Sequence, residues 1–116
     1  MKREFVYLQN FDRAWKSLGL TDNELFKLEN MILMQPNKGE LIQGTGGLRK
    51  IRVGIDGRGK SSGIRVLYVD FEHYGRIYGL FAYRKNESEN ITDVQKQMFR
   101  QLINELLEEL KRKKVK

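Results

Sequence analysis

Basic side chains and glycines are concentrated in one short part of the chain. Residues 48–65 carry six basic residues against one acidic residue, and seven glycines lie between positions 44 and 63. The basic residues are Arg49, Lys50, Arg52, Arg58, Lys60 and Arg65. Glycine permits tight turns and close approach of the backbone to a ligand, and clustered cations neutralise anions. The pattern favours an anion site over its alternative, two polar hairpin loops with solvent-screened charges.

The charge of the whole chain points to the same kind of ligand. The net charge is +7 and the isoelectric point is near 9.7, which favours an anionic partner, nucleic acid first. Residues 86–110 carry six acidic and two basic residues, so the positive charge belongs to the segment around residues 48–65.

One stretch formally matches a nucleotide-binding loop. Gly54, Gly59, Lys60 and Ser61 satisfy the pattern GxxxxGK[ST] of a P-loop. In a P-loop this pattern opens a helix whose amides meet the phosphates, whereas here it leads into residues 64–68, which read as a strand. We therefore interpret it as a basic loop.

Other catalytic groups are scarce. His73 is the single histidine and lies at an expected turn, so no histidine pair is available for acid and base catalysis. Glu105, Glu108 and Glu109 are typical of a solvated helix face. The chain has no cysteine, which excludes a thiol nucleophile and thiolate metal sites. Chemistry is left to lysine, arginine and tyrosine, and we expect no metal and no cofactor.

The first half of the chain reads as a strand and two helices. Residues 4–9 alternate as a strand does, and residues 11–18 have apolar side chains at helical spacing before Gly19. A capping box of Thr21 and Glu24 predicts a second helix that ends before Pro36. A short strand at residues 41–42 follows.

The second half reads as three strands and a long helix. Residues 48–55 alternate, with Lys50 and Arg52 on the face opposite to the apolar residues. Residues 64–71 and 77–83 predict a hairpin around a turn at 73–75. A second capping box, Thr92 with Gln95, precedes an apolar stripe over residues 99–110, and we expect residues 111–116 to be a frayed basic tail.

These elements predict an α+β fold in one domain over residues 1–116. We expect a twisted antiparallel sheet of four or five strands, with two N-terminal helices on one face and a C-terminal helix added. Residues 1–15 lack the apolar segment of a signal peptide, and no apolar run approaches the roughly 20 residues that cross a bilayer. We therefore expect a soluble cytoplasmic protein.

Several runs carry a resemblance to a known family. They are QPNKG at 35–39, IQGTGGLRKIR at 42–52, GRGKSSGIRVLY at 57–68 and YRKNE at 83–87. In order and spacing they resemble the HigB-like branch of the RelE/ParE toxin superfamily, over residues 35 to about 109. The resemblance implies a toxin of a type II toxin–antitoxin system with a RelE-like fold. It would cleave mRNA in the ribosomal A site through attack by the 2′-hydroxyl, without a metal, and a cognate antitoxin would neutralise it.

The resemblance also implies roles for particular residues. Arg65 matches the phosphate-binding arginine, although its phase with Leu67 requires a bulge or a strand end to expose it. Lys50 matches a candidate base, provided that neighbouring cations lower its pKa, whereas Arg52 stabilises charge because arginine stays protonated. Tyr83 and Lys85 match a base-stacking or proton-positioning phenol and an acid. Arg49, Arg58 and Lys60 are expected to contact the RNA or the ribosome.

Two alternatives remain open. A ParE-like toxin that inhibits gyrase would share the fold without cleaving RNA, and a non-catalytic nucleic-acid-binding module would share the charge alone. We expect the ribosome, mRNA and an antitoxin as partners, and operator DNA only through the antitoxin complex.

Overall fold

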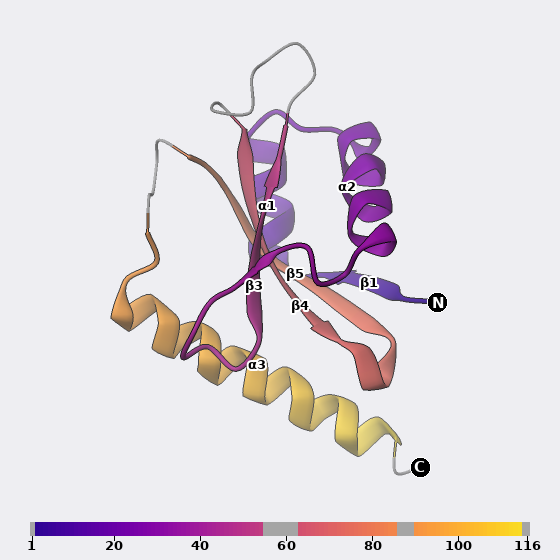
Figure 1. Ribbon diagram of the computed structural model, residues 1–116, viewed down its shortest axis with the longest axis vertical. Helices are drawn as coiled ribbons and strands as arrows, with labels where there is room; N and C mark the ends of the chain where they lie inside the picture. The colour runs from indigo at the N-terminus through magenta and orange to yellow at the C-terminus, as the bar shows by residue number, and fades with distance from the viewer. Residues whose placement is uncertain (1, 55–62, 86–89, 115–116) are drawn as a thin grey trace.

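The chain forms one sheet with helices on both faces (Figure 1). The computed structural model describes residues 2–54, 63–85 and 90–114. The elements are β1 (Glu4–Tyr7), α1 (Gln9–Ser17), α2 (Asp22–Met34), β2 (Glu40–Leu41), β3 (Leu48–Val53), β4 (Ile64–Phe71), β5 (Arg76–Arg84) and α3 (Asp93–Lys114). A single 3-10 turn, Glu72–Tyr74, joins β4 to β5. The predicted α+β class and the order of the elements are confirmed.

The sheet has five strands in the order β1-β5-β4-β3-β2 within the described residues. β2, β3, β4 and β5 pair antiparallel, as the meander predicted. β1 instead pairs parallel to β5, from Glu4 opposite Arg76 to Tyr7 opposite Gly79, so the sheet is mixed. Alternation in the sequence fixes which residues of a strand share a face. It does not show whether two strands far apart in the chain pair parallel or antiparallel, so the parallel pairing of β1 was not predicted.

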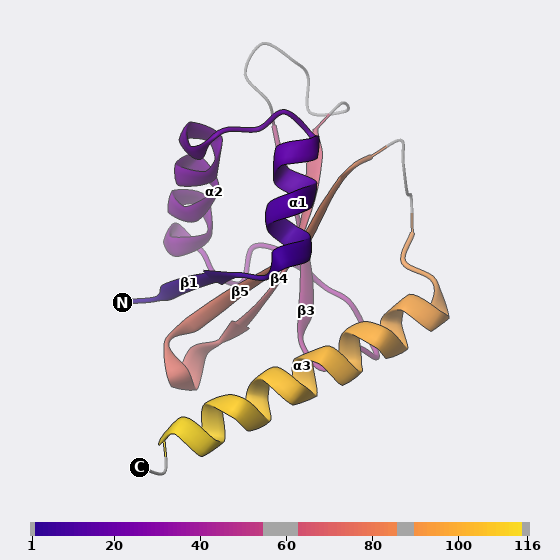
Figure 2. The ribbon, with the colours of Figure 1, turned by 180° about the vertical axis from the view of Figure 1, so that it is seen from behind.

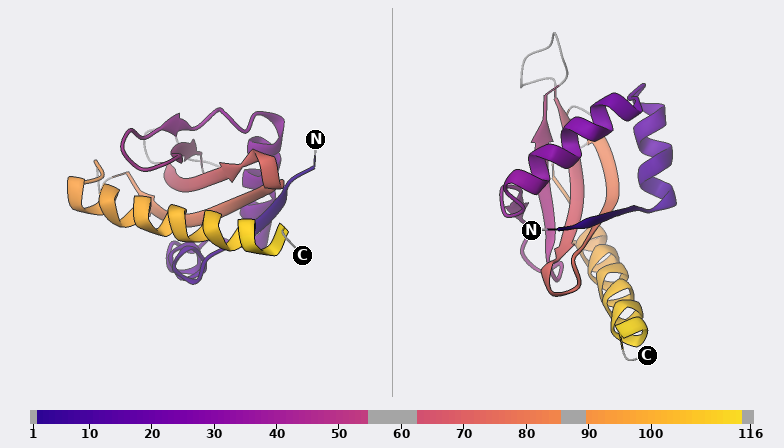
Figure 3. Two further views of the ribbon diagram at one scale, coloured as in Figure 1. Left: turned by 90° about the horizontal axis from the view of Figure 1, so that it is seen from below. Right: turned by 90° about the vertical axis from the view of Figure 1, so that its right-hand side faces the viewer.

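The two faces of the sheet carry separate cores. Phe11 and Trp15 from α1 and Leu28 and Ile32 from α2 pack on one face. Ile103 and other apolar side chains of α3 pack on the opposite face. Figures 2 and 3 show α1 and α2 side by side and α3 running obliquely along the other side of the sheet. The apolar stripe of the last helix therefore packs within the chain.

Both capping boxes form where the sequence predicts them. The backbone N–H of Thr21 donates to Glu24 Oε1 at 2.6 Å at the start of α2. Thr92 and Gln95 exchange reciprocal bonds of 2.9 and 3.1 Å at the start of α3. α3 continues to Lys114, so the helix includes much of the segment expected to fray. No helix in the described ranges is both long enough and apolar enough to span a membrane.

One bulge changes which side chains of β5 share a face. Leu67 pairs with Phe81 and Tyr68 pairs with Gly79, so Leu80 is an extra residue in β5. Gly79 faces the α1 side, where a Cβ atom would lie 2.7 Å from Tyr7. After the bulge, Phe81 and Tyr83 lie on the α3 side instead. Without the bulge, alternation from Gly79 through Phe81 would place Tyr83 on the α1 side.

Candidate nucleic-acid interface

Three predicted site residues form a row across neighbouring strands. The register pairs Arg52 of β3 with Arg65 of β4, and Arg65 with Tyr83 of β5. Directly paired residues project from the same face, with their Cβ atoms about 5 Å apart. We call Arg52, Arg65 and Tyr83 the cross-strand row. The row lies on the α3 side of the sheet, toward the ends of the strands next to residues 55–62.

One guanidinium nitrogen of the row, on Arg65, could bind an anion. Nη1 of Arg65 is buried and has no hydrogen-bond partner among the described residues. Arg52 is exposed directly opposite, and like charges facing each other across strands are unfavourable. A buried cationic donor without a partner also carries a desolvation penalty. A bound phosphate would relieve both costs, because it accepts from arginine and carries the opposite charge.

The other predicted residues fall into three groups. Lys50 lies on the same face of β3 as Arg52, and its ammonium group is 3.8 Å from Glu40 Oε1 of β2. Lys85 is exposed in the turn after β5, two residues beyond Tyr83. Arg58 and Lys60, with the formal P-loop, lie outside the described residues. Lys50 on β3 and Lys85 just after β5 therefore lie beside the row.

Arg49 has different neighbours from those expected. It pairs in register with Tyr68, on the α1 and α2 side of the sheet, away from Lys50. Its guanidinium group donates to the carbonyls of Gly39, at 2.7 Å, and Asn37, at 3.3 Å. In this structure Arg49 is bound to the loop that joins α2 to β2.

Tyr68 of β4 holds the same loop by two hydrogen bonds. Its hydroxyl group donates to the carbonyl of Pro36 at 2.8 Å and accepts the backbone N–H of Gly39 at 3.1 Å. Desolvation by burial is the main cause that raises the pKa of Tyr68. Tyr68 and Arg49 together fix residues 36–39 on the face opposite to the row, a support that sequence reasoning did not identify.

The bulge at Leu80 was also missed, although the sequence carries a signal for it. Gly79 interrupts an otherwise apolar strand, and Leu80 and Phe81 follow without alternation. A glycine inside a strand often marks a bulge. The structure leaves His73 exposed at its turn, as expected. Within the described ranges, no group of three histidine or carboxylate side chains is placed to hold a metal ion.

The fold and the cross-strand row define a small α+β protein with a cationic face built on an antiparallel meander. The family model described as RelE toxin of the RelE/RelB toxin–antitoxin system matches residues 5–116. The chain therefore belongs to the RelE toxin family.

A solved structure agrees on the fold. It is the Escherichia coli toxin RelE, a double arginine-to-alanine mutant in the free state, at 19% sequence identity and a TM-score of 0.52. The similarity covers 77% of this chain and 90% of that one. The finer likeness to HigB stays a prediction from the sequence motifs.

Proposed function

We propose that this toxin is a metal-independent, ribosome-dependent endoribonuclease that cleaves mRNA in the A site and so stops translation. The observation that carries the proposal is the cross-strand row, in which Arg65 has a buried nitrogen without a described partner beside a second arginine. Such a row suits a phosphodiester group, which gains negative charge as the reaction proceeds. Membership of the RelE toxin family supports the proposal that the protein acts in a toxin–antitoxin system.

The reaction assigns a role to each residue of the site. Lys50 takes the proton of the 2′-hydroxyl group as that oxygen attacks phosphorus. Arg65 and Arg52 hold the charge of the pentacoordinate phosphate. The bond from phosphorus to the 5′-oxygen breaks, and the leaving oxygen takes a proton from Lys85. The products are a 2′,3′-cyclic phosphate and a free 5′-hydroxyl end. Tyr83 is buried, with 7% of its surface exposed, so it supports the row from the core and offers no open face to a base.

The proposal places the protein in the cytoplasm with the ribosome and mRNA as its targets. A cognate antitoxin neutralises it, and it reaches operator DNA through the antitoxin complex. Arg58 and Lys60 are proposed contacts to the RNA or ribosome, where charge is needed without strict geometry. Arg49 is also proposed as such a contact; it is half-buried beside the loop at residues 36–39.

The substitution Arg65→Ala tests the site. We expect cleavage of ribosome-bound mRNA, measured by primer extension, to fall by roughly 100-fold or more, as on removal of a donor to a charged transition state. Thermal unfolding should occur at the same or a higher temperature, because a buried cation without a partner is removed. Arg76→Ala is the matched control, since Arg76 lies at the other end of β5 and pairs with Glu4 at 3.1 Å.

Three results would redirect the assignment. A fully active Arg65→Ala variant would remove Arg65 from the site. Growth arrest with intact mRNA and inhibited gyrase would show a ParE-like toxin. Expression without growth arrest would indicate a non-catalytic nucleic-acid-binding module.

A further inference from the structure

A second row of side chains lies next to the cross-strand row, on the same face of the sheet. The register pairs Lys50 of β3 with Leu67 of β4, and Leu67 with Phe81 of β5. Each of these residues lies two positions along its strand from a member of the cross-strand row, so the two rows are about 7 Å apart. A phosphate held at the cross-strand row would therefore have a basic, an apolar and an aromatic side chain beside it.

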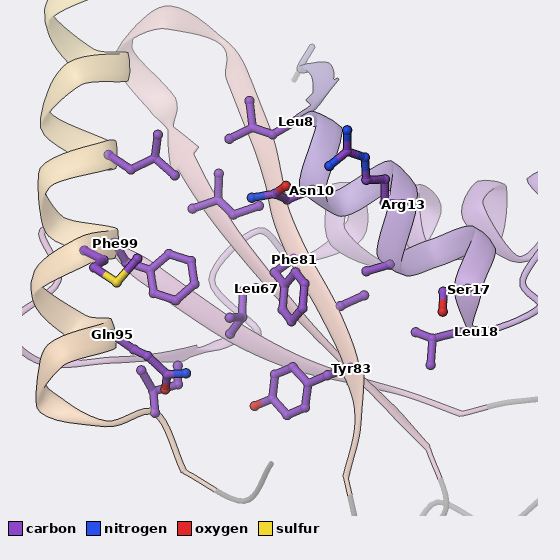
Figure 4. A pocket seen from close by; sticks show the side chains of 16 residues that line it. Leu8, Asn10, Arg13, Ser17, Leu18, Leu67, Phe81, Tyr83, Gln95 and Phe99 are labelled. Carbon is purple, nitrogen blue, oxygen red and sulfur yellow. The ribbon is translucent and has the colours of Figure 1, made fainter. Parts of the chain in front are cut away.

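The second row opens into a groove between α1, β5 and α3 (Figure 4). The volume of the groove is about 830 Å³, within the range of pockets that hold small organic groups. Leu67, Leu80 and Phe81 of the sheet line it, together with Met98 and Phe99 of α3. None of the described residues that line it is acidic, so the groove does not repel a polyanion.

Phe81 offers an aromatic face inside this groove. Its side chain is 38% exposed, whereas those of Leu67 and Tyr83 are only 2% and 7% exposed. The rings of Phe81 and Tyr83 lie nearly parallel, with their centroids 6.4 Å apart and an angle of 25° between their planes. Unpaired bases of RNA stack on exposed aromatic rings. A base on the open side of Phe81 would continue the stack that Tyr83 begins in the core.

We propose that the base of a nucleotide joined to the cleaved phosphate enters this groove and stacks on Phe81. The inference deepens the proposed function and rests on it for the position of the phosphate. A base is linked to its phosphate through a single sugar, so the two groups can occupy adjacent rows. With the phosphate at Arg52 and Arg65 and the base on Phe81, the nucleotide is held at both ends and aligned across the sheet.

Gln95 supplies a polar group for the edge of the base. Its Oε1 atom accepts the backbone N–H of Thr92 at 2.9 Å, as part of the capping box of α3. That bond leaves the Nε2 group of Gln95, which also lines the groove, to donate to a ring nitrogen or a carbonyl oxygen of the base. All four bases carry such acceptors and a flat face, so the groove takes a base with little sequence preference.

Substrates that lack one base test the contact. The probe is end-labelled mRNA in the ribosomal A site with an abasic nucleotide on the 5′ or the 3′ side of the cleaved bond. We expect the wild type to lose roughly tenfold in kcat/KM on one of these two substrates, because stacking of one base on an aromatic ring contributes about that much.

The substitution Phe81→Leu shows whether the ring is responsible. It removes the aromatic face and keeps an apolar side chain, so thermal unfolding should change little. We expect it to lose roughly tenfold on intact mRNA and nothing further on the same abasic substrate, because the two changes remove one contact. Phe81→Tyr keeps the ring and should restore cleavage. Phe26→Leu is the matched control, at a side chain of α2 that is 62% exposed and outside the groove.

A fluorescent base separates the contact from the reaction. 2-Aminopurine loses fluorescence when it stacks, and a 2′-deoxynucleotide at the attacked position prevents cleavage. On ribosomes programmed with such mRNA, we expect the wild type to quench 2-aminopurine next to the phosphate and Phe81→Leu to leave it bright. If the wild type quenches this base but cleaves no ordinary mRNA, the inference stands and the proposed reaction fails.

Three results would overturn the inference while the proposed reaction stands. One is cleavage of both abasic substrates by the wild type at the rate of intact mRNA. Another is an equal loss on the abasic substrates in the wild type and in Phe81→Leu. The third is a Phe81→Leu variant that cleaves normally but binds the purified antitoxin more weakly, which would assign the groove to a protein segment.

Discussion

At the scale of single residues, Tyr68 shows how one buried side chain organises a loop. Its ring is fully buried in the core under α1 and α2, while its hydroxyl group binds Pro36 and Gly39. Arg49 reinforces the same loop from the neighbouring strand. The hydroxyl group of Tyr68 both donates and accepts a hydrogen bond, and these two bonds offset the penalty of burying it.

Gly39 is the residue that this arrangement constrains most. A Cβ atom at this position would lie 2.7 Å from the hydroxyl oxygen of Tyr68 and 2.8 Å from its ring. We expect Gly39→Ala to lower the free energy of unfolding by about 1–3 kcal/mol, as overpacking does. Urea denaturation measures the change.

Gly54→Ala provides the control for that experiment. A Cβ atom at Gly54 would meet no atom of the described residues within 4 Å, so the stability should stay within about 0.5 kcal/mol of the wild type. Equal stability of the Gly39 and Gly54 variants would show that residues 36–39 move away without cost.

At the scale of the elements, the bulge in β5 and the bond between β1 and α2 position the functional face. The bulge at Leu80 directs Tyr83 to the side of Arg65. β1 is attached to α2 by the hydroxyl group of Tyr7, which donates to Glu29 Oε2 at 2.5 Å. β1 pairs only with Arg76–Gly79, the first half of β5, so this attachment also fixes how much of that edge of β5 is covered by β1.

The bond from Tyr7 to Glu29 predicts a dependence of stability on alkaline pH. Burial, followed by the hydrogen bond to Glu29, raises the pKa of Tyr7 above its unfolded value of about 10. Below that pH both states keep the proton and the stabilisation is complete. Above it the unfolded chain ionises first, so stability falls as the pH rises.

Tyr7→Phe should therefore lose less stability than the wild type between about pH 9 and 11. Chemical denaturation at each pH measures the difference, and near neutral pH the gap between the two proteins should be constant. Parallel loss of stability in both proteins up to pH 11 would show that Tyr7 ionises as readily in the folded state. Tyr68 and Tyr78, whose pKa values are also raised by burial, account for the remaining loss.

At the scale of the whole molecule, the basic residues of the sheet and those of α3 have different acidic neighbours. Arg52 and Arg65 lie on the strands, whereas the acidic residues of α3 are exposed and partly paired. Glu108 lies 3.7 Å from Lys111, and Glu109 lies 3.2 Å from Lys113. Lys111 and Lys113 are therefore paired within the helix.

This difference in pairing predicts which basic residues determine the salt dependence of binding to mRNA-programmed ribosomes. The logarithm of the affinity for mRNA-programmed ribosomes should fall linearly with the logarithm of the salt concentration. Arg52→Gln should reduce the slope by about 0.7, the value for one contact to a single-stranded phosphate. Lys113→Gln, at a position paired with Glu109, should leave the slope unchanged. A normal slope for Arg52→Gln would exclude a phosphate contact.

The sequence by itself determined most of the elements and predicted the kind of ligand. Alternation over residues 48–53 placed Lys50 and Arg52 on one face, and the capping boxes of Thr21 and Thr92 marked the starts of two helices. These signals are local, because strand alternation and helix capping depend on residues within a few positions of each other. The motifs added the family, which the match over residues 5–116 shows.

Only the tertiary structure decided how distant segments meet. The parallel pairing of β1, the bulge that turns Tyr83 toward Arg65 and the binding of Arg49 to residues 37–39 all join positions far apart in the chain. Such contacts depend on register between strands and on volume in a shared core, and neither leaves a periodic trace in one sequence. The basic segment is visible in the sequence, whereas the row that joins two of its arginines to Tyr83 needs three strands in register.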